Sequence, residues 1–424
     1  MYYRILFVIA LFAVSAFAQS SEMSLDEAVK YALTNNKGLQ ADRQQIAVAT
    51  GKMKQAALRA NPLLDVSHKA DLGDFKQGEF AIGLSLPLEY NGRRARRIAV
   101  AEQELERIKL EVAERERKLA AEVRTKYGEA VEAARYLELN EKLLELNQES
   151  LKIIKARVTE GASAPLEQSQ LQVEVGRIEA QRATYASRVE VLGEELKNLS
   201  GMSVDEKIKV RDEFAEHPLT LTREQLTELA LKSRPDLQAA RAAASVAQAL
   251  IAQAKAEGRF DLSVFTEFSQ DAIGFDQLGL NRQTGRPEQI FMRSAMLKGG
   301  VTITLPTRNK NQGNIEAAVA MSEEARLRQE FIASVIRREI AAAYTRYEGA
   351  QRVLKIYNTD LLAAAQNNLR VMRASFDLGH VRLTEVLNEQ RRLIEVQMAY
   401  TAALKEYFSA RVELENVMGT AIEK

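Results

Sequence analysis

Two proline-free stretches, residues 93–160 and 311–378, place the strongest constraint on how this chain can fold. Each is 68 residues long and is followed directly by a glycine, Gly161 or Gly379. An α-helix rises by about 1.5 Å per residue, so each stretch predicts a helix about 100 Å long. We therefore expect a fold organised around two very long helices in equivalent places.

The first 18 residues are typical of a secretory signal peptide. Arg4 supplies a positive end, residues 5–14 form an apolar run, and Ala16-Phe17-Ala18 is a small-x-small cleavage site. A membrane anchor is the alternative, but a spanning helix needs about 20 apolar residues. The chain has no cysteine, which excludes disulfides, thiolate metal sites and lipid attachment after the cleavage site.

Charge and hydropathy exclude further classes. The net charge is +1, from 59 basic and 58 acidic residues that are well interspersed. Proteins that bind nucleic acid concentrate basic residues on one face, so we expect no nucleic-acid partner. After the signal no stretch reaches the length of a transmembrane helix, and any membrane-spanning part would have to consist of strands.

The mature chain reads as a duplicated unit. Five residues recur with a spacing of 198, namely Leu33, Leu39, Gln40, Ala41 and Arg43 as Leu231, Leu237, Gln238, Ala239 and Arg241. Gly161 and Gly201 recur 218 residues later as Gly379 and Gly419. The additional 20 residues fall within 270–300, a segment that we interpret as a surface loop.

Each repeat is predicted to contain the same elements. The first repeat, 19–201, has an opening helix, a strand hairpin at 63–88, the long helix 93–160 and a return helix at 165–200. A connector at 202–221 follows. The second repeat, 222–419, has an opening helix that Pro235 is expected to kink, strands at 260–269 and 298–306, the long helix 311–378 and a return helix at 382–418. The return helices carry seven-residue apolar columns, which indicate coiled-coil packing.

The predicted strands alternate between apolar and polar residues, as in Leu64-Asp65-Val66-Ser67. This pattern fits the wall of a membrane β-barrel and equally a half-buried sheet in a soluble domain. Four strands cannot close a barrel, and an open sheet edge cannot face lipid, so a membrane sheet would require several chains. Three copies would give 12 strands, with the long helices continuing as a tube. Aromatic residues could form a girdle: Phe75, Phe80, Tyr90, Phe260 and Phe268.

No motif indicates an enzyme, a cofactor or a metal site. His68, His217 and His380 lie far apart and none is paired at metal-ligand spacing. The sequence has no phosphate loop, nucleophile elbow or dinucleotide fingerprint.

The turns after the two long helices are the only places with a candidate site. Acidic residues lie near them: Glu160, Glu167, Asp377 and Glu385. In a symmetric oligomer one inward carboxylate per chain forms a ring of charge, which favours cations. The alternative is that these acids lie on the solvated outside.

The order of these features resembles the TolC-type outer-membrane efflux factors over the whole mature chain. The resemblance rests on the opening block Leu25-Asp26-Glu27-Ala28, the junctions Leu86-Pro87 to Arg94 and Leu305-Pro306 to Gly313, the glycine turns, and the ends Leu196–Gly201 and Leu414–Gly419. It implies a mainly α fold: a homotrimer with a long α-helical coiled-coil tunnel in the periplasm and a 12-stranded barrel in outer-membrane lipid. It also implies a passive exit duct that docks on a periplasmic adaptor (membrane fusion protein) and an inner-membrane pump, of the RND type.

The resemblance also assigns residues to roles. Glu167 and Glu385 match the family's tunnel-entrance acids, and Asp377 lies beside them. Gly161 and Ala162, and likewise Leu378, Gly379 and His380, match the tips that dock on the adaptor. Three positions depart from the polar latch of some members: Phe376 replaces a tyrosine, Val381 an arginine and Asn388 a second acid. Closure of the entrance is therefore expected to rest on packing.

The junction Glu89-Tyr90-Asn91-Gly92-Arg93-Arg94 is similar to that of the heavy-metal cation branch, which favours metal ions as cargo. Drugs, other small organic molecules and secreted protein remain alternatives. A periplasmic coiled-coil scaffold without a channel, and a secreted enzyme, are alternatives of other classes.

Overall fold

We analysed a computed structural model, which describes residues 22–70, 72, 77–216 and 218–419. The predicted signal peptide, His217 and Phe75 lie outside the described residues. The chain divides into two compact units, one comprising residues 1–40, 116–225 and 340–424 and the other residues 41–115 and 226–339. Of the helices in the described residues, none has the length and apolar character needed to cross a membrane.

The first repeat begins with strand β1 (Glu22–Met23) and helices α1 (Leu25–Asn35) and α2 (Lys37–Ala57). Strands β2 (Leu63–Ala70) and β3 (Gly78–Leu88) follow, then the long helix α3 (Arg93–Thr159) and the return helix α4 (Pro165–Ser200). The opening helix predicted as one element is thus two. The side chain of Asn36 separates them, because its Oδ1 accepts a hydrogen bond from the backbone N–H of Leu39 and its Nδ2 donates to the carbonyl of Leu199.

The second repeat follows the same order. It contains α5 (Arg223–Ser233), α6 (Pro235–Glu257), β5 (Asp261–Leu280), β6 (Pro287–Thr304), α7 (Gln312–Ile356), α8 (Leu362–Asp377) and α9 (Leu383–Met418). Pro235 is the first residue of α6, a position where proline is favoured because its missing N–H would have no partner in the helix. The sequence predicted a kink here, whereas the structure has a break between two separate helices, α5 and α6. The predicted long helix 311–378 is interrupted by a π-helical segment, Tyr357–Leu361, before α8 continues it.

The segment interpreted as a surface loop is mostly strand, and that interpretation was wrong. β5 runs to Leu280 and β6 starts at Pro287, so only a short turn separates two strands that were predicted at 260–269 and 298–306. The side chains of this segment no longer alternate as they do in the earlier strands, which is why the sequence did not predict strands here. The two strands stay paired because the hydrogen bonds between them come from the backbone and not from the side chains.

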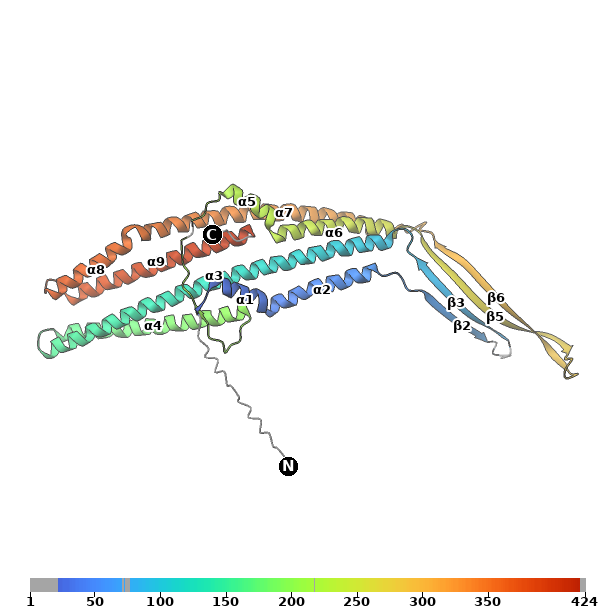
Figure 1. The fold of residues 1–424 in the computed structure, drawn as a ribbon, viewed down its shortest axis with the longest axis horizontal. Helices are drawn as coiled ribbons and strands as arrows, with labels where there is room; N and C mark the ends of the chain where they lie inside the picture. Colours follow the sequence, from blue (N-terminus) through green and yellow to red (C-terminus); the bar gives the residue numbers. More distant parts are fainter. Residues whose placement is uncertain (1–21, 71, 73–76, 217, 420–424) are drawn as a thin grey trace, which may run out of the picture. The chain divides into compact units, whose positions relative to one another are not determined.

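The four long strands form one antiparallel sheet in the order β2-β3-β5-β6 (Figure 1). Its register places apolar side chains on one face, here called the apolar face: Leu64, Val66, Ile82, Leu84, Leu86, Leu262, Val264, Phe268, Leu297, Val301 and Ile303. The opposite face, here called the polar face, carries Asp65, Ser67, Lys69, Glu79, Ser85, Ser263, Glu267, Ser269, Asp271, Lys298 and Thr302. The predicted alternation is therefore present over most of the sheet, with Gln270 and Arg293 as exceptions on the apolar face and Phe265 and Met296 on the polar face.

Arginines at the start of α3 hold the junction between helices and strands together. Arg93 donates to the carbonyls of Ala256, Glu257 and Arg259 at the end of α6. Arg94 donates to the carbonyl of Ala57 at the end of α2. The last carbonyls of a helix lack intrahelical partners and carry partial negative charge, so cationic donors stabilise them. The two basic residues of the junction thus have a structural role.

The connector joins the long helices within the first unit. Its strand β4 (Lys209–Val210) pairs in parallel with β1. Tyr127 of α3 is buried, and its hydroxyl lies 2.8 Å from the carbonyl oxygen of Met23 and 2.7 Å from that of Arg211. In the second repeat the hydroxyl of Tyr347 accepts a hydrogen bond from the backbone N–H of Leu219. Each long helix therefore fixes part of the connector through a tyrosine.

Replacing Ala342 by Pro tests how far the fold depends on an unbroken α7. Ala342 is exposed, so the change removes a backbone hydrogen bond without affecting the core. We expect a loss of about 3 kcal/mol or more and failure of trimer assembly, measured by size-exclusion chromatography in detergent. Ala342→Gln, a good helix former at the same exposed site, should assemble normally. A normal trimer from Ala342→Pro would contradict the dependence of assembly on this helix.

Candidate entrance and docking tips

Two helical hairpins of the first unit end in turns of the same construction. One joins α3 to α4 and the other joins α8 to α9 (Figure 1). In the first turn the N–H of Gly161 donates to the carbonyl of Val158 and that of Ala162 to the carbonyl of Arg157. In the second, Gly379 donates to Phe376 and His380 to Ser375 in the same pattern. Both are Schellman motifs, which satisfy the last carbonyls of a helix.

The Schellman motif explains the two glycines. Gly161 has a φ of 75° and Gly379 a φ of 77°, in the left-handed region where a Cβ atom is unfavourable. Both glycines are exposed, as are Ala162, Leu378 and His380. The residues predicted as docking tips thus lie on the accessible surface of two tight, stiff turns.

The return helices start within four residues of each turn glycine. Pro165 begins α4 behind Ala164, and Leu383 begins α9 behind Arg382. This arrangement places Glu167 and Glu385 in the first turns of their helices, where a carboxylate is favoured by the positive end of the helix dipole.

Three carboxylates lie on the helices next to the turns: Glu167, Asp377 and Glu385. Glu167 is half-buried, whereas Glu385 and Asp377 are exposed. Among the described residues, none of the three side chains forms a hydrogen bond or an ion pair. A carboxylate without a protein cation beside it keeps its full charge available to passing ions. These acids belong to one compact unit, and both hairpins contribute to the set.

A small apolar cluster fastens the two hairpins together next to the tips. Ile154, Leu171 and Leu383 are buried in it, and Phe376 packs against them. They come from α3, α4, α9 and α8 respectively. The sequence departed from the family's polar latch at Phe376, and the structure places this ring in apolar packing.

Polar contacts that the sequence analysis did not identify lie farther from the tips. Glu174 of α4 accepts hydrogen bonds from Arg177 and, at 3.4 Å, from Arg391 of α9. The hydrogen bonds from Arg177, with the charge of Arg391, hold the pKa of Glu174 below its usual value of 4.5. Its carboxylate therefore remains ionised near neutral pH and connects the two hairpins.

Glu389 of α9 is a second residue that was missed. It is 6% exposed, and Arg392 bonds one of its oxygens while the other has no partner among the described residues. The signal was present in the sequence. Val386 belongs to the seven-residue apolar repeat of this helix. Glu389 lies three residues later, where such a repeat normally has its second apolar residue, so a carboxylate is unusual there.

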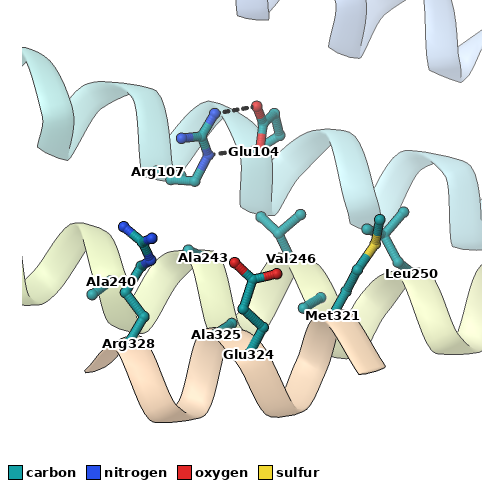
Figure 2. A pocket seen from close by; sticks show the side chains of 11 residues that line it. Glu104, Arg107, Ala240, Ala243, Val246, Leu250, Met321, Glu324, Ala325 and Arg328 are labelled. Atoms are coloured by element: carbon teal, nitrogen blue, oxygen red, sulfur yellow. Dashed lines mark hydrogen bonds and ion pairs between the residues drawn. The ribbon is translucent and has the colours of Figure 1, made fainter. Parts of the chain in front are cut away.

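In the second unit, a hollow of about 590 Å³ lies among α3, α6 and α7. Figure 2 shows Glu104 and Arg107 of α3 paired with each other, and Glu324 and Arg328 of α7 on the opposite side of the hollow. Mostly small side chains of α6 complete the lining. The lining thus contains two acidic and two basic groups, and no nucleophile or histidine. Over the described ranges no cluster of three or more histidine and carboxylate side chains could hold a metal ion.

The chain thus combines paired long helices, closed by accessible turns, with a sheet that has one mainly apolar and one mainly polar face, as the sequence analysis expects of an outer-membrane duct. The comparison with known families agrees: the model of the outer membrane efflux protein family matches residues 28–202 and 226–420. The chain belongs to the outer membrane efflux protein family. The family prediction and the predicted fold class are confirmed.

Individual relatives are distant but match over nearly their full length. The Cobalt-zinc-cadmium resistance protein CzcC of Cupriavidus metallidurans is 21% identical over 403 residues, which cover 94% of this chain and 90% of the relative. The crystal structure of CusC has a TM-score of 0.75 at 19% identity and covers 95% of this chain and 93% of its own. The outer membrane protein VceC of Vibrio cholerae has a TM-score of 0.70 at 19% identity, covering 94% and 97%.

Membership of the family settles the general function. The protein is an outer-membrane efflux duct with a large periplasmic part, and it is not an enzyme. Proteins of this family are trimeric and work in tripartite systems with a periplasmic adaptor and an inner-membrane pump.

Two glycine-to-alanine changes, one at Gly379 in a tip and one at Gly349 within α7, test whether the positive φ of the turn requires glycine. An added Cβ meets no atom within 4 Å at Gly379 or at Gly349 in α7, but only Gly379 has a positive φ. We expect Gly379→Ala to lower the free energy of unfolding by about 1 kcal/mol, and Gly349→Ala to raise it by up to about 1 kcal/mol through helix propensity. Thermal denaturation followed by circular dichroism measures both. Equal shifts of the same sign would contradict the assignment of the Schellman turn.

Proposed function

We propose that this duct exports heavy-metal cations, in a tripartite system with a periplasmic adaptor and an inner-membrane pump of the RND type. The observation that carries the cargo is the relative that matches 94% of the chain and is named for cobalt, zinc and cadmium resistance. The duct itself is passive. The pump supplies the energy, and the duct provides a path from the adaptor to the exterior.

We further propose that the tips dock on the adaptor. Gly161 and Ala162 of one turn, with Leu378, Gly379 and His380 of the other, form the contact surface. Leu378 is 72% exposed, and an apolar side chain at the end of a stiff turn is suited to insertion between partner helices. The two Schellman turns hold the backbone in place, so docking orders little additional chain.

The entrance acids act as a charge filter in this proposal. Three copies would bring Glu167, Asp377 and Glu385 into rings near the periplasmic end. Because no arginine or lysine among the described residues pairs with these side chains, their charge attracts cations and repels anions. The apolar cluster around Phe376 would hold the entrance closed until the adaptor engages the tips.

Removing the charge of Glu385 tests the filter. We expect Glu385→Gln in the purified trimer to reduce the preference for cations over anions severalfold, measured from reversal potentials in a planar bilayer under a salt gradient. Glu385→Asp retains the charge and should keep the wild-type preference. If Glu385→Gln is as cation-selective as the wild type, Glu385 is not part of a charge ring.

A tolerance panel tests the cargo. A strain lacking this protein is compared with the same strain carrying the gene on a plasmid, on zinc, cobalt, nickel and copper salts and on dyes, detergents and antibiotics. We expect growth to be lost on metal salts alone and restored by the plasmid. Sensitivity confined to organic compounds would replace the metal proposal by a drug or detergent duct, and a secretion defect alone would indicate protein cargo.

A further inference from the structure

The hairpin of β5 and β6 continues well beyond the rest of the sheet. The pairing of β3 with β5 ends at Gly78 opposite Ala272, whereas β5 continues to Leu280. From Ile273 onward, the only strand paired with β5 in the described part of the chain is β6 (Figure 1). We call residues 273–280 and 287–292 the ribbon. An isolated two-stranded ribbon is at best marginally stable in water, so this one needs a further contact.

Within the ribbon the side that continues the polar face becomes apolar, and the opposite side also carries apolar residues, Phe291, Leu278 and Leu280. Ile273 is paired with Met292, and Phe275 with Ile290. Side chains on one strand alternate between faces, so these four lie on the same side of the hairpin as Asp271 and Ser269 below them, which is the polar face of the sheet. The side that is mostly polar in the sheet, where Phe265 and Met296 are exceptions, becomes apolar just above it.

The described part of the chain covers these four side chains only partly. Their exposed fractions are 47% for Ile273, 41% for Phe275, 42% for Ile290 and 50% for Met292. On the opposite side the ribbon has Gly274, and a Cβ there would lie 2.6 Å from the amide of Gln77, which approaches from the first hairpin. Gln77 of the first hairpin therefore contacts the side that continues the apolar face, where Leu278 and Leu280 are also exposed; we call the side of Ile273 and Phe275 the open side.

The position of the open side determines what can cover it. In a trimeric duct the apolar face of each sheet faces lipid, and the polar face is turned towards the channel axis. The four ribbon side chains continue the polar face, so they are turned towards the axis and away from the lipid. Phe275 lies three residues beyond the end of the sheet pairing, about 10 Å farther along the axis. At that height the groups across the axis are the same side chains of the other two copies.

We propose that the ribbons of three copies pack against one another through Ile273, Phe275, Ile290 and Met292 and form an apolar constriction at the outer end of the duct. The inference rests on the assignment of the chain as a trimeric duct, but it concerns the end opposite to the periplasmic tips. A ring of apolar side chains excludes water and ions from a narrow passage until its members separate. The constriction limits inward leakage, and outgoing cargo opens it by displacing three marginally stable ribbons.

Single cysteines test the contact directly, because the natural chain has none. Met292→Cys places a thiol on the open side of the ribbon. Gln289→Cys places one on the opposite side, since the Gln289 amide lies next to Gly274. After mild oxidation of cells or of purified trimers, we expect a disulfide-linked dimer of chains on a non-reducing gel for Met292→Cys and none for Gln289→Cys. Absence of the dimer with Met292→Cys, or equal dimer with both variants, overturns the proposal.

Conductance tests the constriction. The double variant Phe275→Ser, Ile290→Ser makes the inward ring polar, whereas Leu278→Ser changes a residue paired with Gln289 on the other side of the ribbon. We expect the double variant to conduct severalfold more than the wild type in a planar bilayer and Leu278→Ser to match the wild type. Equal conductance of all three proteins overturns the constriction while leaving the duct intact. A wild-type protein that forms no trimer would overturn the duct assignment and this inference together.

Discussion

The structure depends most on the neutralisation of helix ends where the helices give way to strands. The short helices α2 and α6 stop next to the sheet, and their last carbonyls would face the junction without partners. Arg93, Arg94 and Arg97 of α3 donate to carbonyls at both ends, and Arg97 also pairs with Glu89. Because these arginines belong to the helix that leaves the sheet, they fix its direction as well as its neighbours. The basic pair that resembles the metal branch in sequence thus stabilises the junction by binding helix-end carbonyls.

The two ends of the duct use different physical means. At the periplasmic end, two Schellman turns make the tips stiff, and acids at the starts of α4 and α9 leave charge exposed. Packing of Phe376 against Leu171 and Leu383, with the Glu174–Arg391 contact, joins the hairpins near these tips. In the proposed constriction, a hairpin that continues past its sheet places apolar side chains on the channel side. The proposed charged entrance and the proposed apolar exit suit a duct that accepts cations from a pump and resists leakage from outside.

The sequence predicted the structure correctly where the backbone conformation requires or excludes one residue type, such as glycine at a positive φ or proline inside a helix. The glycines after both long helices, and the absence of proline within them, were sufficient to predict the helices and the tips. It failed where pairing depends on a partner strand: residues 270–300 have no steady alternation, and yet they continue both strands of a hairpin because each supplies the other's backbone hydrogen bonds. It also missed Glu174 and Glu389, whose partners and burial depend on how α4 and α9 approach each other.

The sequence by itself determined the repeat, the long helices, the strand alternation and the family, because each is written in local periodicity or in turn residues. The tertiary structure alone decided that the side chain of Asn36 divides the first opening helix and which carbonyls the junction arginines bind. It also decided which side of the ribbon is open. These features depend on contacts between residues far apart in sequence, such as Gly274 with Gln77, and no local pattern encodes such a contact.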